Sequence, residues 1–167
     1  MRWLPYFILA YLAIGVQIGA GEFMRFHGAK PDLVLLAVIF ISINAPREPA
    51  LLGCFLMGMM ADLVSGTSFG LYALAYALVS MFTVSTQEIV YREHPLTHVS
   101  LGFAGALLVA ALELIHGWRY GASIPPATLF ASAVYTAALA PIFLGVMQRT
   151  KRIFSFQTSR RRMRGVA

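Results

Sequence analysis

The stretch Gly58-Met-Met-Ala-Asp62-Leu-Val-Ser-Gly66-Thr-Ser-Phe-Gly70-Leu-Tyr-Ala-Leu74 lies between two apolar runs and carries a single acidic side chain. Gly58, Asp62, Gly66 and Gly70 recur every four residues, so a continuous helix would place them on one face. The composition of residues 65–68 is instead typical of a turn. The stretch therefore predicts a helix that ends close to residue 64 and a second helix that follows the turn.

Asp62 has two interpretations. In the structural one, its carboxylate accepts hydrogen bonds from Ser65, Thr67 or Ser68, or from the free backbone N–H groups where the next helix starts. In the functional one, the carboxylate faces a cavity or a partner helix, as acids within membranes often do. A turn beside a helix end favours the structural interpretation. The glycines and the adjacent Leu63 indicate only that another backbone can approach closely here.

The composition of the chain is that of an integral membrane protein. Of its 167 residues, 59% are hydrophobic and 12% are charged, against about 25% charged residues in a soluble domain. We expect one membrane domain over residues 1–150, followed by a basic tail over residues 151–167. The single cysteine, Cys54, excludes an intramolecular disulfide and a cysteine metal site.

The apolar runs predict an all-α protein with about six transmembrane helices in a compact bundle, at residues 1–21, 33–44, 50–64, 69–90, 99–116 and 126–147. The third run has fifteen residues, and the second has twelve, or fifteen if its helix starts at Pro31. Fifteen residues cover about 22 Å, against about 30 Å of hydrocarbon. The two runs either form a hairpin that dips into the membrane or span it with local thinning, and we favour spanning. Between them, residues 46–49 are predicted to form a rigid turn. Pro141 is expected to kink the last helix.

Small residues at helical spacing mark three candidate faces for helix packing or for a partner. They are Gly15 and Gly19 in the first run, Ala73 and Ala77 in the fourth, and Gly102 and Ala106 in the fifth. Such spacing is common in ordinary membrane helix packing. For Gly15 and Gly19, a dedicated dimer face is the alternative, which would make a homodimer.

Two further polar groups were considered as sites. Glu113 lies one turn before His116, and the pair either relays protons or forms an interfacial hydrogen bond, which we favour. His94 and His98 invite a metal interpretation, but Pro95 lies between them and no third ligand is evident, so we expect no metal. Residues 91–98 are predicted to form a charged loop.

Basic residues predict the orientation of the chain. With six spans, ten Lys and Arg residues lie on the side of the termini and three, Arg25, Lys30 and Arg119, lie on the other side. The positive-inside rule then places both termini in the cytoplasm. Six of the ten are candidate topology or anionic-lipid anchors in the tail: Lys151, Arg152, Arg160, Arg161, Arg162 and Arg164. Because the excess charge is confined to this end, it says little about a nucleic-acid surface, and no nucleic-acid partner is expected.

Sequence motifs of catalysis are missing. The chain has no GxxxxGK[ST] or HExxH motif, no paired-aspartate helix motif of lipid phosphotransferases, and no internal repeat of a secondary transporter. We therefore expect neither an enzyme nor a bound cofactor, and favour a scaffold or binding subunit.

Three stretches carry a family resemblance: Trp3-Leu4-Pro5-Tyr6, Pro31-Asp32-Leu33-Val34-Leu35, and Gly58-x-x-x-Asp62-Leu63-x-x-Gly66-x-x-x-Gly70 with Ala73-Leu74 behind it. With them the chain resembles the MreD family of rod shape-determining membrane proteins. The likeness covers most of the length and is weakest beyond Val99.

The resemblance implies a non-catalytic scaffold in the bacterial inner membrane that binds MreC and supports cell-shape control and peptidoglycan synthesis. MreB, RodA and a class B penicillin-binding protein would belong to the same machinery. The family is also similar in fold to the S components of energy-coupling-factor vitamin transporters. That similarity implies an alternative function, a small-molecule-binding subunit, and would place the turn after Asp62 on the periplasmic side.

Overall fold

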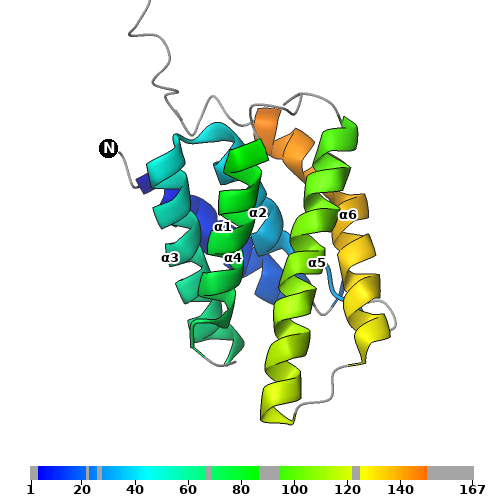
Figure 1. Cartoon of the computed structure of the whole chain (residues 1–167). Helices are drawn as coiled ribbons and strands as arrows, with labels where there is room; N and C mark the ends of the chain where they lie inside the picture. The colour runs from blue at the N-terminus through cyan, green and yellow to red at the C-terminus, as the bar shows by residue number, and fades with distance from the viewer. Residues whose placement is uncertain are drawn as a thin grey trace, which may run out of the picture.

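The computed structural model describes residues 4–21, 23–25, 28–66, 69–86, 95–121 and 125–149. These residues form an all-α bundle, as the apolar runs predict, and the start of the first helix and the end of the last helix lie at the same end of it (Figure 1). The helices are α1 (Leu4–Gly21), α2 (Leu33–Asn44), α3 (Arg47–Ser65), α4 (Leu71–Thr86), α5 (Pro95–Tyr120) and α6 (Pro126–Arg149).

Three helices in the described part of the chain are long and apolar enough to cross a membrane. They comprise residues Arg47–Ser65, Leu96–Tyr120 and Pro126–Arg149, whereas the apolar segments Ile8–Gly19, Leu33–Asn44 and Leu71–Thr86 are shorter. The prediction of six helices is confirmed by the helices of the described residues. The prediction that all six span the bilayer remains a prediction.

The short helix α2 is the centre of the bundle. All of its 12 residues are buried, and it contacts each of the other five helices. Leu35, Leu36 and Ile39 have no exposed surface. A helix that is apolar on every side is stable only when other helices surround it, which explains why α2 lacks the polar face of a surface helix.

Two predicted loops were placed incorrectly, and a proline explains each error. Residues 46–49, expected to form a turn, are the N-cap and first turn of α3, which begins at Arg47 rather than at residue 50. The last residues of the expected loop 91–98 are the first turn of α5, which begins at Pro95. The first N–H groups of a helix have no intrahelical partner, so proline is tolerated there and marks a start.

Close packing joins the helices in pairs, α3 with α4 and α5 with α6. A Cβ atom on Gly58 would lie 2.5 Å from both the Cα atom of Ala73 and the carbonyl oxygen of Tyr72. A Cβ atom on Gly102 would lie 2.8 Å from the Cβ atom of Ala140. These two glycines therefore allow helix backbones within the chain to approach one another.

Candidate functional site

The turn between α3 and α4 is built around the Asp62 carboxylate. Asp62 is 2% exposed, and its Oδ2 accepts hydrogen bonds from the backbone N–H groups of Gly70 at 2.9 Å and Ala73 at 3.1 Å. Its Oδ1 accepts one from the N–H of Tyr72 at 2.8 Å. The first N–H groups of α4 have no partner within the helix, so the carboxylate supplies the missing acceptors. This is the structural interpretation of Asp62.

Two glycines give the turn its shape. Gly66 caps α3 in the left-handed region at φ 64°, and Gly70 precedes α4 at φ 104°. A side chain is strained at both angles, which accounts for glycine at these positions. Leu63, the other member of the motif, is 72% exposed. The motif therefore forms a joint between two helices, and residues 67 and 68 lie outside the described residues.

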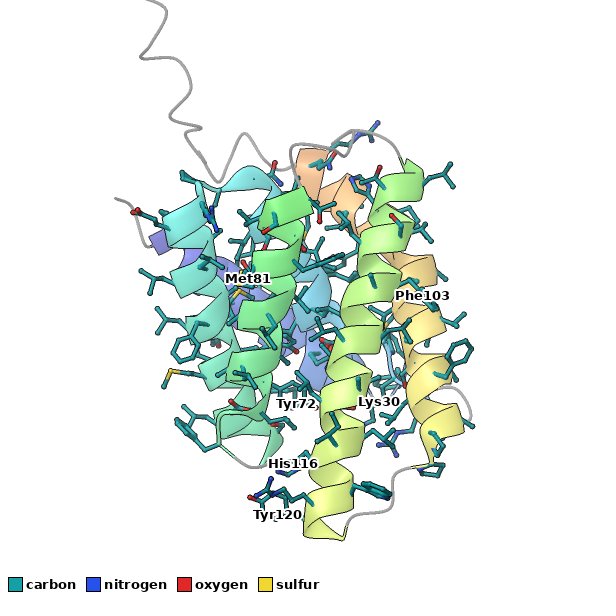
Figure 2. The ribbon with its side chains drawn as sticks, in the orientation of Figure 1. Lys30, Tyr72, Met81, Phe103, His116 and Tyr120 are labelled. Atoms are coloured by element: carbon teal, nitrogen blue, oxygen red, sulfur yellow. The ribbon has the colours of Figure 1, made fainter. Side chains whose placement is uncertain are left out.

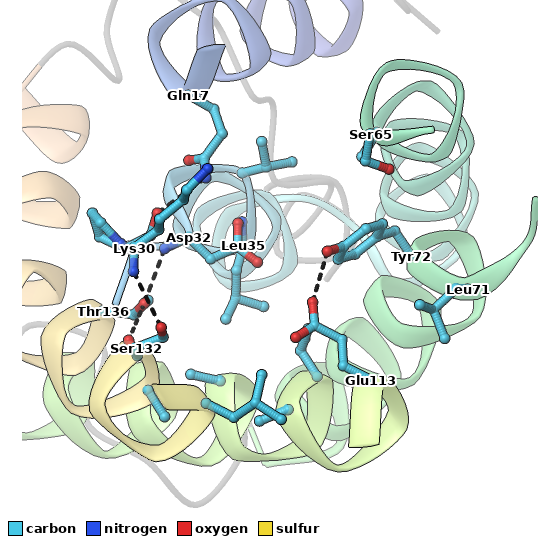
Figure 3. Close-up of a pocket in the computed structure, with 18 of the residues that line it drawn as sticks. Gln17, Lys30, Asp32, Leu35, Ser65, Leu71, Tyr72, Glu113, Ser132 and Thr136 are labelled. Atoms are coloured by element: carbon cyan, nitrogen blue, oxygen red, sulfur yellow. Dashed lines mark hydrogen bonds between the residues drawn. The ribbon is translucent and has the colours of Figure 1, made fainter. Parts of the chain in front are cut away.

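A cavity of about 740 Å³ opens at the end of the bundle where α1, α3 and α5 finish and α2, α4 and α6 begin. Most of its lining is apolar. Its polar lining includes Gln17, Lys30, Asp32, Tyr72, Glu113 and Thr136 (Figure 3). The start of α1 and the end of α6 lie at the opposite end of the bundle (Figure 1).

Asp32 forms one wall of this cavity as the N-cap of α2. Its Oδ1 accepts the backbone N–H of Leu35 at 2.9 Å, and the Tyr76 hydroxyl lies 3.2 and 3.0 Å from the two carboxylate oxygens, to which it donates. The backbone N–H of Asp32 donates to Thr136 Oγ1 at 3.0 Å. The residue thereby ties the start of α2 to α4 and α6.

Gln17 holds the same segment from the side of α1. Its Nε2 donates to the carbonyl oxygen of Pro31 at 3.0 Å, and its Oε1 accepts the N–H of Leu33 at 2.8 Å. From α6, Ser132 Oγ accepts the N–H of Lys30 at 3.1 Å. The backbone that leads into α2 is thus fixed from two sides, so the wall is pre-organised.

Glu113 and Tyr72 form another wall. The Tyr72 hydroxyl donates to Glu113 Oε1 at 2.6 Å (Figure 3). The ring centroids of Tyr72 and Tyr76 lie 5.7 Å apart. The sequence suggested His116, one turn away on the same helix, as the partner of Glu113. The structure shows a hydrogen bond between Glu113 and a tyrosine on α4. Oε2 of Glu113 forms no hydrogen bond within the described part of the chain.

Among the residues that the structure describes, no group of three His, Cys, Asp or Glu side chains is placed so that it could bind a metal ion. His98, considered above as a ligand, lies 3.0 Å from the side-chain nitrogen of Gln148 through its Nε2. What the cavity offers instead is hydrogen-bond acceptors and aromatic rings against an apolar lining.

Comparison with protein families gives a match over residues 1–150 to the model described as rod shape-determining protein MreD. The chain belongs to the MreD family. MreD proteins are membrane proteins with a role in rod-shape determination, which fits an apolar helical bundle with candidate membrane spans. Comparisons with curated proteins and with solved structures gave no match.

The structure separates the predicted small-residue faces of this MreD-family chain into two groups. Ala73, Gly102 and Ala106 are buried between helices of the bundle, and Ala77 is partly buried. Gly15 and Gly19 on α1 are exposed, and a Cβ atom at either would have no neighbour within 4 Å. The first group is occupied by packing within the chain, and the second is open.

Of the polar cavity residues, Glu113 is a candidate from the sequence and Asp32 enters only through the family resemblance, whereas Gln17, Tyr72 and Tyr76 are not predicted. Asp32 directly precedes the second apolar run, and an aspartate at that position is a signal for a helix N-cap. Tyr72 and Tyr76 are one helical turn apart, which puts both rings on one face of α4. Nothing in the local sequence connects Gln17 to Pro31 or Tyr72 to Glu113. The basic tail, Lys151 to Arg164, lies outside the described residues.

Proposed function

We propose that this protein is a non-catalytic membrane subunit of the rod-shape machinery that holds the transmembrane segment of MreC against α1. The family match supports a role in rod-shape determination. The observation that carries the proposal is the open pair Gly15 and Gly19, because a neighbouring helix can approach a backbone closely only where no side chain intervenes.

The surroundings of this pair suit a helix of another chain. Within the bundle α1 contacts mainly α2 and α3, which leaves its other side uncovered. Large apolar side chains flank the glycines there: Tyr11, Leu12, Val16 and Ile18 are all exposed. A single-span partner could place its own side chains between them, by ridges into grooves.

The proposal includes an orientation of the protein in the membrane. Both termini would lie in the cytoplasm, where the tail from Lys151 to Arg164 can meet anionic lipid. The cavity and the turn after Asp62 would then face the periplasm. MreB, RodA and the class B penicillin-binding protein would belong to the same assembly.

Co-purification with MreC tests the proposal. The double variant Gly15→Leu/Gly19→Leu should recover at least ten-fold less MreC from gently solubilised membranes, because leucine side chains fill the space that the partner helix needs. Gly145→Leu is the matched control, since Gly145 is a helical glycine of α6 that also has no neighbour within 4 Å. Equal recovery of MreC by the double variant and the control would refute docking on α1.

The same preparation separates the alternative function. A small-molecule-binding transporter subunit should be isolated with a coupling ATPase and without MreC. A homodimer formed through Gly15 and Gly19 should appear as twice the mass of the chain in native mass spectrometry, and should be lost in the double variant.

A further inference from the structure

Two carboxylates face the same cavity without a charge partner. Neither Asp32 nor Glu113 lies within ion-pair distance of a Lys, Arg or His side chain among the described residues. Their partners are tyrosine hydroxyls and a backbone N–H. Acidic side chains in membrane proteins are costly and usually pair with a positive group or mark a ligand path. Among the described residues, the cavity therefore has two carboxylates that are not paired with a positive side chain. A positively charged ligand that enters the cavity would supply the counter-charge.

Glu113 presents the more available of the two carboxylates. Tyr72 donates to its Oε1, whereas Oε2 has no hydrogen bond to any residue that the structure describes. Every enclosed side-chain nitrogen and oxygen in the described part of the chain has a partner, so Oε2 is not enclosed, and the Glu113 carboxylate points into the cavity that it lines (Figure 3). A carboxylate oxygen held in position by a hydrogen bond to its neighbour is a pre-organised acceptor.

Aromatic rings stand beside the carboxylates. Tyr72 and Tyr76 both line the cavity, their ring centroids are 5.7 Å apart, and each donates its hydroxyl to one of the two acids. The face of an aromatic ring attracts a cation, and an alkylammonium group gains from rings and carboxylates together. The wall formed by α4 and α5 thus combines the two features that recognise organic cations.

The size and lining of the cavity suit a small organic molecule. Its volume of about 740 Å³ lies within the range of about 300–1,000 Å³ typical of small-molecule sites. Apolar side chains such as Leu35, Val109 and Leu129 make up much of the remaining lining. Lys30 also lines the cavity, at about the same level of the bundle as Tyr72 (Figure 2). It lies across the cavity from Glu113, beside Gln17 and Ser132 (Figure 3).

We propose that this cavity binds an organic cation, a protonated amine or quaternary ammonium group on a short apolar body, with the positive group between the Glu113 carboxylate and the Tyr72 and Tyr76 rings. Asp32 contributes negative charge from the adjacent wall. The ligand is either a soluble amine or the ammonium headgroup of a membrane lipid. The proposal does not depend on docking of a partner on α1.

Choline and its neutral carbon analogue, 3,3-dimethylbutan-1-ol, test the proposal as a matched pair of probes. Both are titrated by calorimetry into the full-length protein in detergent. Choline should bind, and the neutral alcohol should bind at least ten-fold more weakly, because the two differ only in the charge of the central atom. Absence of choline binding, or equal binding of the two probes, would overturn the proposal.

Matched variants locate the site. Glu113→Gln keeps an acceptor for the Tyr72 hydroxyl and should weaken choline binding at least ten-fold. Asp32→Asn keeps an oxygen for the N-cap and should weaken it less. Glu48→Gln is the control, because it removes an exposed carboxylate at the other end of the bundle and should leave binding unchanged. Thermal unfolding verifies that each variant is folded. Unchanged choline binding by a folded Glu113→Gln variant would place the cation elsewhere and refute the site.

Vesicles distinguish the two sources of the cation. The protein is reconstituted in phosphatidylglycerol alone or with phosphatidylethanolamine added, and choline is titrated into both. If a lipid headgroup is the natural ligand, phosphatidylethanolamine should reduce choline binding at least ten-fold. If the ligand is a soluble amine, the two vesicles should bind choline equally. Either result supports a cation site, provided that the neutral alcohol still binds weakly.

Discussion

Asp62 and Glu113 are both acids in an apolar bundle, but the protein uses them in opposite ways. Asp62 is enclosed, and its two oxygens accept three backbone N–H groups at the start of α4. Glu113 has one oxygen held by Tyr72 and the other open to a cavity. Both carboxylate oxygens of Asp62 are used by the fold, whereas one oxygen of Glu113 remains available to a ligand. This difference, rather than the presence of an acid, distinguishes a residue that joins two helices from a candidate binding group. Four predictions test this contrast, beginning with the largest change in stability.

Removal of the Asp62 carboxylate should cause the greatest loss of stability. Asp62→Ala leaves three N–H groups at the start of α4 without an acceptor, and each unsatisfied buried group costs about 1–3 kcal/mol. We expect a loss of about 3 kcal/mol or more in the free energy of unfolding, measured by denaturant titration in detergent. Asp62→Asn keeps one oxygen and should lose less. Wild-type stability of Asp62→Ala would show that the turn does not depend on these bonds.

Gly58→Ala should have the next largest effect. The new methyl group would lie 2.5 Å from backbone atoms of α4, which cannot move as a flexible side chain can, and overpacking costs about 1–3 kcal/mol. Gly145→Ala is a control with the opposite sign, because that position has open space and alanine favours a helix by about 0.5–1 kcal/mol. Thermal unfolding of both variants measures the difference. Equal midpoints would contradict the close approach of α3 and α4.

Tyr76→Phe should cost about 1 kcal/mol, because it removes one hydroxyl donor from Asp32 and leaves the ring in place. The loss is smaller than at Asp62, since Asp32 keeps the N–H of Leu35. Tyr11→Phe, at an exposed position of α1, provides the comparison and should be neutral within about 0.5 kcal/mol. If Tyr76→Phe were equally neutral, the bond between α4 and the start of α2 would contribute nothing.

Glu113→Gln should change the free energy of unfolding least, by less than about 1 kcal/mol, because the amide oxygen still accepts the Tyr72 hydroxyl. Its effect should fall on choline binding instead. A large loss of stability in this variant would mean that the Glu113 charge serves the fold, as Asp62 does, and the contrast between the two acids would be lost.

The sequence predicted the parts of the fold that depend on local signals. The helix end before Gly66 and the capping of the next helix by Asp62 follow from turn residues beside an apolar run. The six helices follow from apolar runs. The starts of α3 and α5 were predicted too late, because prolines were taken as turn residues when they occupy the first helical turn.

The cavity could not be predicted from local patterns, since its contacts join distant parts of the chain. Tyr72 and Glu113 are separated by 41 positions, and Asp32 and Tyr76 by 44. Sequence spacing pointed to His116 as the partner of Glu113 because the two are neighbours on one helix. Which side chains meet across a bundle depends on the packing of helices, and a single sequence gives no measure of that packing.

The burial of α2 has a consequence for how the protein is made. α2 contacts every other helix that the structure describes, including α6, which is the last of these to be synthesised. While the chain is being inserted, α2 is a segment of 12 residues that is short for a bilayer and still lacks part of its final surroundings. Its environment is complete only once synthesis has reached the far end of the bundle. A chain cut before α6 should therefore be recognised and degraded by membrane quality control, even though its first helices are intact.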